Sequence, residues 1–171
     1  MWWWILGLVV VILFLFFWWI FPLFFHGIPW QPTDMKRVRR MLEMAKPNPN
    51  ELLVDLGCGD GRICIEAARR FGIRAIGYEI NPWLYLLARL RIFFSGVSHR
   101  VRVELRDIHQ VDLSQVNIVT LFLFQHVNDR LEKKLSEELP SGSRVVSYIW
   151  IFKGWQPAEI DRVLRLYLYI R

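Results

Sequence analysis

The sequence predicts an α/β fold in which one apolar N-terminal helix precedes a doubly wound, mostly parallel sheet. From residue 51 onward, short apolar runs typical of strands alternate with helical segments, as in parallel strands joined by right-handed crossovers. The first run leads directly into a glycine-rich loop at residues 57–61. Too few residues separate the last run from its predecessor for a helical crossover, so we expect an antiparallel last strand.

The N-terminal helix is expected to be a transmembrane anchor over residues 1–25. This segment has no charged side chain, so all 22 Lys and Arg and all 16 Asp and Glu lie after it. Crossing a bilayer takes about 20 apolar residues. Tryptophans gather near both ends of the run, as in the aromatic belts of membrane interfaces. A cleaved signal peptide is the alternative, but it would need a basic start and small residues before the cut.

Residues 26–46 are predicted to form a juxtamembrane connector and a basic helix. Pro29 and Pro32 stiffen the connector, and Thr33 is the expected N-cap of the helix. The basic residues of this segment are Lys36, Arg37, Arg39, Arg40 and Lys46. Because no Lys or Arg precedes the anchor, the positive-inside rule predicts a single-pass membrane protein with a cytoplasmic domain. The bilayer, in particular its anionic lipids, is therefore an expected partner.

The net charge of +6 could also indicate nucleic-acid binding. No helix-turn-helix, zinc or RNA-binding signature accompanies the charge, so we expect no nucleic-acid partner. Cys58 and Cys64 have neither redox nor zinc-ligand spacing, and we predict two buried thiols and no metal site.

Residues 47–171 are predicted to form the globular domain that carries the site. Strands are expected at residues 52–56, 74–80, 101–105, 117–124, 144–152 and 164–170, and helices at 62–71, 82–94 and 128–139. In an open α/β sheet, ligands bind at the carboxyl ends of the strands. Acidic residues follow the strands at this edge, and the glycine loop lies beside them.

The glycine loop differs from the dinucleotide fingerprint GxGxxG. With Gly57 and Gly59 as its first two glycines, the third would fall at Arg62, whereas the sequence has Gly61. Asp55, just ahead of the loop, suits a ligand with an ammonium group and repels a pyrophosphate. Glu79 can accept from both hydroxyls of a ribose, and Asp107 from an adenine amino group. These features indicate S-adenosylmethionine.

The motifs around these residues resemble those of class I (seven-β-strand) methyltransferases. Within that class, the segments 29–33, 55–62, 77–83 and 144–157 resemble a subgroup of protein-lysine methyltransferases. The subgroup acts on the mitochondrial adenine nucleotide translocase and the ATP synthase c subunit, and includes a broad-specificity archaeal enzyme. The resemblance implies a Rossmann-like fold that binds S-adenosylmethionine over residues 47–171. The cofactor-binding residues it implies are Pro32, Thr33, Asp55, Gly57, Gly59, Asp60, Gly61, Glu79, Asn81 and Asp107. Trp30 departs from the subgroup, which typically has Tyr there.

Methyl transfer to lysine requires a deprotonated amine, which an apolar or aromatic pocket favours by desolvation. The aromatic residues we expect around the lysine are Phe122, Phe124, Trp150 and Trp155. Gln125 and Asn128 could hydrogen-bond the amine or the cofactor, although Asn128 also suits a plain helix N-cap. His109 and His126 are more typical of structural or solvated residues. No Ser-His-Asp or Cys-His set is required for this chemistry and the sequence contains none, so we assign no catalytic residue.

The sequence leads to a membrane-anchored, S-adenosylmethionine-dependent protein-lysine N-methyltransferase whose substrate is a membrane or membrane-associated protein. One alternative keeps the cofactor and has a lipid or a small amphiphilic amine as acceptor. A second alternative is a non-catalytic module that binds the cofactor and recruits partners.

Overall fold

The computed structural model describes residues 2–26 and 31–171, with side chains for residues 2–16 and 31–171. The chain divides into two compact units, Met1–Gln31 and Pro32–Arg171. The first unit contains helix α1 (Trp3–His26). In the described part of the chain, which in α1 includes side chains only as far as Phe16, no helix is long and apolar enough to cross a membrane.

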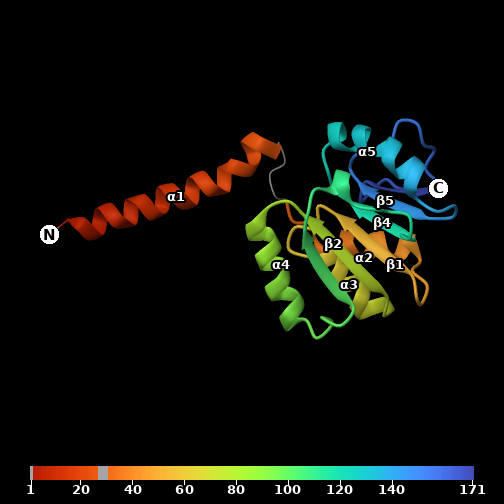
Figure 1. Ribbon diagram of the computed structural model, residues 1–171. Coiled ribbons are helices and arrows are strands. Elements are labelled where there is room, and N and C mark those ends of the chain that lie inside the picture. The colour runs from red at the N-terminus through yellow and green to blue at the C-terminus, as the bar shows by residue number, and fades with distance from the viewer. Residues whose placement is uncertain (1, 27–30) are drawn as a thin grey trace. The chain divides into compact units, whose positions relative to one another are not determined.

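The second unit is built on one seven-stranded sheet, whose order is β3-β2-β1-β4-β5-β7-β6 (Figure 1). The strands are β1 (Leu52–Leu56), β2 (Arg74–Glu79), β3 (Val101–Leu105), β4 (Ile118–Leu121), β5 (Arg144–Tyr148), β6 (Glu159–Asp161) and β7 (Leu166–Ile170). Strands β1 to β5 pair in parallel, and β7 runs antiparallel to both of its neighbours. The predicted doubly wound sheet with an antiparallel last strand is confirmed.

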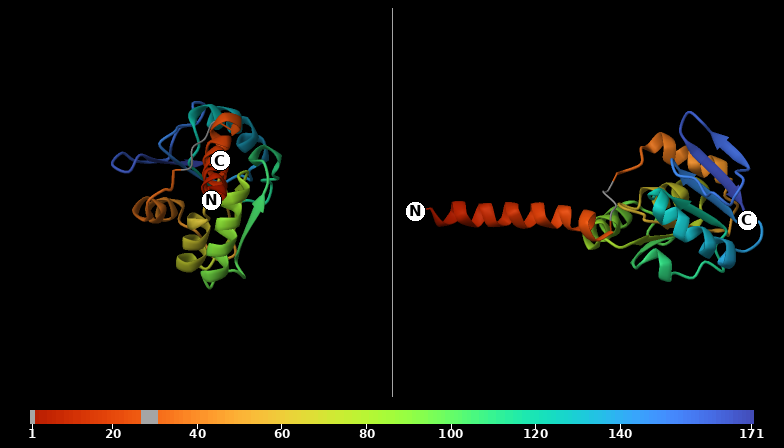
Figure 2. Two further views of the ribbon diagram at one scale, coloured as in Figure 1. Left: turned by 90° about the vertical axis from the view of Figure 1, so that its left-hand side faces the viewer. Right: turned by 90° about the horizontal axis from the view of Figure 1, so that it is seen from above.

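Helices cover both faces of the sheet (Figure 2). They are α2 (Met35–Ala45), α3 (Arg62–Phe71), α4 (Pro82–Phe94) and α5 (Gln125–Glu138), with a short 3₁₀ turn η1 (Ile108–Gln110) after β3. Side chains of α2, α3 and α4 share one buried cluster with residues of the strands, while α5 lies on the opposite face from α2 (Figure 2). Because helices cover both faces of the parallel strands, neither face meets water. This explains why these strands are nearly continuous apolar runs in the sequence.

Helix α2 belongs to the sheet unit. Val38, Met41 and Leu42 are fully buried in the common core, and the boundary between the two units falls at residues 31 and 32. The predicted boundary lay between residues 46 and 47. The N-cap prediction was wrong, because Asp34 rather than Thr33 accepts from the backbone N–H of Arg37.

Several element boundaries differ from the predicted ones. Strand β4 ends at Leu121 and β5 at Tyr148, although their apolar runs continue into the following loops. Helix α5 begins at Gln125, so Asn128 lies inside its first turn and does not cap it. Strand β6 was missed because its three residues, at the edge of the sheet, show neither an apolar run nor a clear alternation.

Candidate active site

The glycine loop between β1 and α3 is shaped by three left-handed residues. Gly57, Gly59 and Gly61 have φ of 81°, 56° and 75°, a region that side chains with a Cβ rarely adopt. A Cβ at Gly57 would also lie 2.8 Å from Cδ2 of Leu123. The loop therefore turns sharply and presents its backbone at the carboxyl edge of the sheet, as predicted from the sequence.

Glu79, the last residue of β2, joins this loop to the start of α4. Its Oε2 accepts from the backbone N–H of Gly59 at 2.8 Å, and its Oε1 from those of Ile80 and Asn81 at 2.9 Å. The side chain is buried and its position is fixed from two directions. Glu79 is therefore held in place beside the glycine loop, at the carboxyl edge of the sheet.

Asp55, in β1, is a buried carboxylate directly beneath the loop. Its register partner on β4 is Thr120, whose hydroxyl donates to Asp55 Oδ1 at 2.8 Å. Burial raises the pKa of Asp55 to about 7, the hydrogen bond from Thr120 opposes the rise, and the negative charge of Glu79 adds to it. Asp55 and Glu79 are both buried, and two carboxylates that repel each other disfavour each other's charge and favour a cationic ligand group.

The side chains of Asp60 and Asn81 bond to other residues of the protein. Asp60 is buried and bridges Arg62 on α3 and Arg91 on α4, while Arg62 also donates to the backbone carbonyl of Thr33 at 2.7 Å. Asn81 is the N-cap of α4 and accepts from the backbone N–H groups of the first turn. The structure therefore places both side chains in the frame around the loop, where they position it.

The remaining residues predicted to bind the cofactor lie in two places, just before α2 and just after β3. Thr33 is buried and Pro32 exposed at the start of the unit. Asp107 follows β3, caps η1 by accepting from the N–H of His109 at 2.9 Å, and is half-buried. Trp30 lies outside the described residues.

Two aromatic pairs stand at the carboxyl ends of the neighbouring strands β4 and β5. Phe122 packs on Tyr148 with ring centroids 4.3 Å apart, and Phe124 faces Trp150 at 6.2 Å. The guanidinium of Arg37, from α2, lies 5.2 Å from the ring of Tyr148. All four rings are half-buried. The structure thus brings three of the predicted aromatic residues to the same edge as the glycine loop and adds Tyr148 to them.

Asn128 lies next to these aromatic residues and is fully buried. Its Nδ2 lies 3.4 Å from the hydroxyl oxygen of Ser147, which donates to the carbonyl of Trp150. Among the described residues, its Oδ1 has no hydrogen-bond partner. A buried acceptor without a donor costs stability, and such atoms in native proteins commonly face a ligand or water.

Gln125 and Trp155 both hold the loop that follows β5. The amide of Gln125 bonds both the carbonyl and the N–H of Ile151, and so fixes the loop after β5. Trp155 packs against Phe152 and Tyr169, and its indole N–H donates to the hydroxyl of Ser136 at 3.0 Å. Trp155 therefore secures this loop against α5.

Comparisons with known proteins agree with this geometry. A family model described as the ANTKMT methyltransferase domain matches residues 55–159, which include the glycine loop, Glu79 and both aromatic pairs. The chain belongs to the ANTKMT methyltransferase domain family. It is a methyltransferase that uses S-adenosylmethionine.

Two named relatives and one solved structure are 38–43% identical to this chain. A protein-lysine N-methyltransferase of Saccharolobus islandicus is 43% identical, over 80% of this chain and 85% of the relative. An adenine nucleotide translocase lysine N-methyltransferase of Mus musculus is 40% identical, over 78% of this chain but only 58% of the relative's length. A Salinibacter ruber structure described as an RNA methyltransferase with S-adenosyl-L-homocysteine has a TM-score of 0.78 and 38% identity. The match covers 81% of this chain and 91% of that chain.

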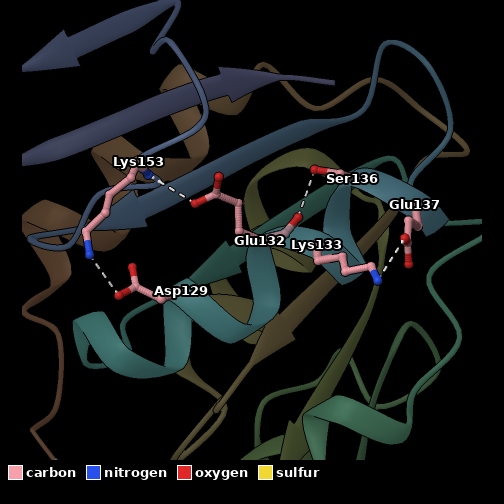
Figure 3. A pocket seen from close by; sticks show the side chains of 6 residues that line it. All are labelled: Asp129, Glu132, Lys133, Ser136, Glu137 and Lys153. Atoms are coloured by element: carbon pink, nitrogen blue, oxygen red, sulfur yellow. Dashed lines mark hydrogen bonds and ion pairs between the residues drawn. The ribbon is translucent and has the colours of Figure 1, made fainter.

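One further hollow of the methyltransferase lies on the outer side of α5 (Figure 3). Its lining side chains are charged or polar and pair among themselves, for example Lys153 with Asp129 at 3.0 Å and Lys133 with Glu137 at 3.7 Å. None of the predicted site residues lines it. Its lysines and carboxylates satisfy each other, so we assign no ligand to it.

Sequence reasoning missed Thr120 and Tyr148 as members of the site. Thr120 lies in the apolar run of β4, and only the pairing register with Asp55 reveals its role. Tyr148 could have been found, because it is the last residue of β5 and the carboxyl ends of strands form the site.

Proposed function

We propose that the methyltransferase is a membrane-anchored protein-lysine N-methyltransferase whose substrates are membrane or membrane-associated proteins. The observation that carries the lysine assignment is the 43% identity to a protein-lysine N-methyltransferase over most of both chains. Relatives named for the ATP synthase c subunit and the adenine nucleotide translocase support a membrane-protein substrate. This chain spans only 58% of the length of those two relatives.

S-adenosylmethionine supplies an electrophilic methyl group on a sulfonium. In our proposal the backbone of Gly57–Gly61 approaches the cofactor closely, and Glu79 accepts from its ribose hydroxyls. The ionised form of Asp55 attracts its ammonium group, and Asp107 accepts from its adenine amino group. Asp60, Arg62 and Arg91 keep the loop in place through their ion pairs.

The lysine is proposed to enter between the aromatic pairs Phe122–Tyr148 and Phe124–Trp150. A lysine with a pKa near ~10.4 must lose a proton before its Nζ can attack, and half-buried rings favour the neutral amine by removing water. The same rings tolerate the cationic product through cation–π attraction. The free Oδ1 of Asn128 is proposed to accept a hydrogen bond from the lysine amine and so to point the lone pair of Nζ at the methyl group.

The membrane part of the proposal rests on the N-terminal sequence. Residues 1–25 have no charge, and α1 extends from Trp3 to His26 with exposed apolar side chains as far as Phe16. Basic residues follow this helix closely, which by the positive-inside rule favours a cytoplasmic catalytic unit. Confinement to a surface would raise the effective concentration of membrane substrates.

The experiment is to follow the methyl group. The purified full-length protein and methyl-labelled S-adenosylmethionine are incubated with host membranes, which are then divided into lipid, protein and RNA fractions. Asp55→Asn is the negative control, because it retains an acceptor for Thr120 but removes the charge. Asp112→Asn, at an exposed carboxylate outside the site, is the matched control and should behave as wild type.

Label on lysines of a membrane protein, lost in Asp55→Asn only, is the expected result. Label in the lipid fraction would move the function to an amphiphile methyltransferase. Label in RNA would contradict the expected absence of a nucleic-acid substrate and would agree with the name given to the Salinibacter ruber structure. No label in any fraction, with the cofactor still bound, would favour the non-catalytic module.

A further inference from the structure

Helix α4 exposes an apolar stripe on the side that faces away from the sheet. Its buried side chains are only Ala88 and Ile92, and the opposite side of the helix carries Trp83, Leu86, Leu87, Leu90, Phe93 and Phe94. Phe93 and Phe94 are exposed by 72% and 79%. With 3.6 residues per turn, positions 83, 87, 90 and 94 fall on one line along the helix. Contiguous exposed apolar groups of this kind mark interaction sites.

The same surface is basic. Arg89 borders the stripe on one side, Arg100 lies in the loop between α4 and β3, and both are exposed. Arg91 borders the stripe on the other side, but it pairs with the buried Asp60. Arg69, from α3, donates to the carbonyl of Ser95 at the end of α4 and adds its charge there. Helix α5 differs, since its Arg130, Lys133 and Lys134 face four carboxylates of the same helix.

The helix that the sequence suggested for lipid contact is less suited to it. On α2, Arg39 pairs with Glu66 at 3.0 Å, and Arg40 pairs with Glu159 at 2.7 Å. Arg37 pairs with Asp34. The charge of these arginines is therefore largely compensated within the fold, and α2 buries its apolar side in the core.

We propose that the outer face of α4 docks onto an anionic lipid bilayer, with its leucine and phenylalanine side chains in the headgroup region. An apolar face bordered by arginines is the chemistry that binds at such an interface, because apolar burial and attraction to anionic lipids act together. A second copy of the chain would instead place arginine-rich surfaces against each other. The bilayer is therefore the occupant that complements both the charge and the apolar stripe.

This docking would orient the catalytic unit. Helix α4 begins at Pro82, three residues after Glu79, so its first turn adjoins the cofactor loops. Docking α4 would hold these loops at the membrane surface. The inference goes beyond the N-terminal anchor and does not depend on which substrate is methylated.

The test places an environment-sensitive fluorophore at Phe94→Cys in the full-length chain. The native thiols, Cys58 and Cys64, are buried, and labelled wild type measures their background. Glu137→Cys, on the exposed side of α5, is the matched control position. Proteins are reconstituted into vesicles of phosphatidylcholine with or without phosphatidylserine. We expect a blue shift and higher intensity at position 94 with phosphatidylserine, reversed by high salt, and no change at position 137.

A second pair of variants tests the charge. In the Phe94→Cys protein, Arg89→Gln with Arg100→Gln should reduce the shift, whereas Lys133→Gln, a change on α5, should leave it unchanged. Equal signals at positions 94 and 137 would overturn the proposal. So would a shift that does not depend on phosphatidylserine, or one that appears without vesicles and grows with protein concentration, since the latter would identify a face between copies of the chain.

Discussion

At the scale of single residues, Asp55 links the site to the stability of the free enzyme. Its pKa is raised from the ordinary 3.8 to about 7 by burial, so the folded protein holds a proton that the unfolded chain releases. Below pH 3.8, Asp55 makes its full contribution to the free energy of unfolding. This contribution decreases as the pH rises, and it is gone once the carboxyl group of the folded protein ionises near pH 7. The loss is roughly 1.4 kcal/mol per pH unit within this window.

The measurement is urea unfolding of wild type and Asp55→Asn without cofactor, between about pH 5 and 8. The stability of wild type relative to Asp55→Asn should fall with rising pH and become constant above about 7. Asp112→Asn serves as control, because a backbone N–H lowers the pKa of Asp112 and the group stays ionised throughout. Parallel pH profiles of wild type and Asp55→Asn would show that Asp55 is ionised in the folded protein.

Asn128 allows a test of the lysine side of the site. Asn128→Leu keeps the buried volume but removes the acceptor, whereas Asn128→Asp keeps an acceptor at the same place. We expect Asn128→Leu to lower kcat for lysine methylation by about tenfold or more, the effect of about 1.4 kcal/mol on the barrier. The dissociation constant of S-adenosylmethionine should stay unchanged. Equal kcat in wild type and Asn128→Leu, with both folded, would exclude this role.

At the scale of elements, the glycine loop depends on close packing beneath it. A Cβ at Gly77 in β2 would lie 2.5 Å from Sγ of Cys58 and 2.7 Å from its Cβ. We expect Gly77→Ala to cost about 1–3 kcal/mol, as overpacking of a core does, measured from the urea midpoint. The double variant Cys58→Gly with Gly77→Ala removes the opposing atoms and should recover part of the loss. No recovery would mean that the clash is not the cause.

Elements with a strong periodic signal were predicted well, and their ends were not. The apolar run at residues 117–124 reads as one strand, but β4 stops at Leu121 because Phe122 and Phe124 turn to pack with Tyr148 and Trp150. The glycine loop and Glu79 were predictable because spacing alone defines them. The ion pair of Asp60 with Arg91 was not, since it joins residues 31 positions apart.

At the scale of the whole molecule, we propose that the two units have separate functions, catalysis and membrane attachment. The unit Pro32–Arg171 has its own core and contains the glycine loop, Glu79 and both aromatic pairs. The first unit contributes the apolar helix α1. Cofactor binding should therefore depend on the second unit, and firm membrane attachment on the first.

Removing residues 1–28 tests this division. The shortened protein should bind S-adenosylmethionine with unchanged affinity in calorimetry but should no longer resist extraction from membranes by alkaline carbonate. As a matched control, Leu8→Arg with Ile12→Arg keeps the full length but opposes insertion by about 2.5–3.5 kcal/mol per charge at a helix centre. If docking through α4 also holds, the shortened protein keeps salt-sensitive binding to anionic vesicles. Full-length protein that carbonate releases would refute the anchor, and a folded but cofactor-free second unit would refute the division of work.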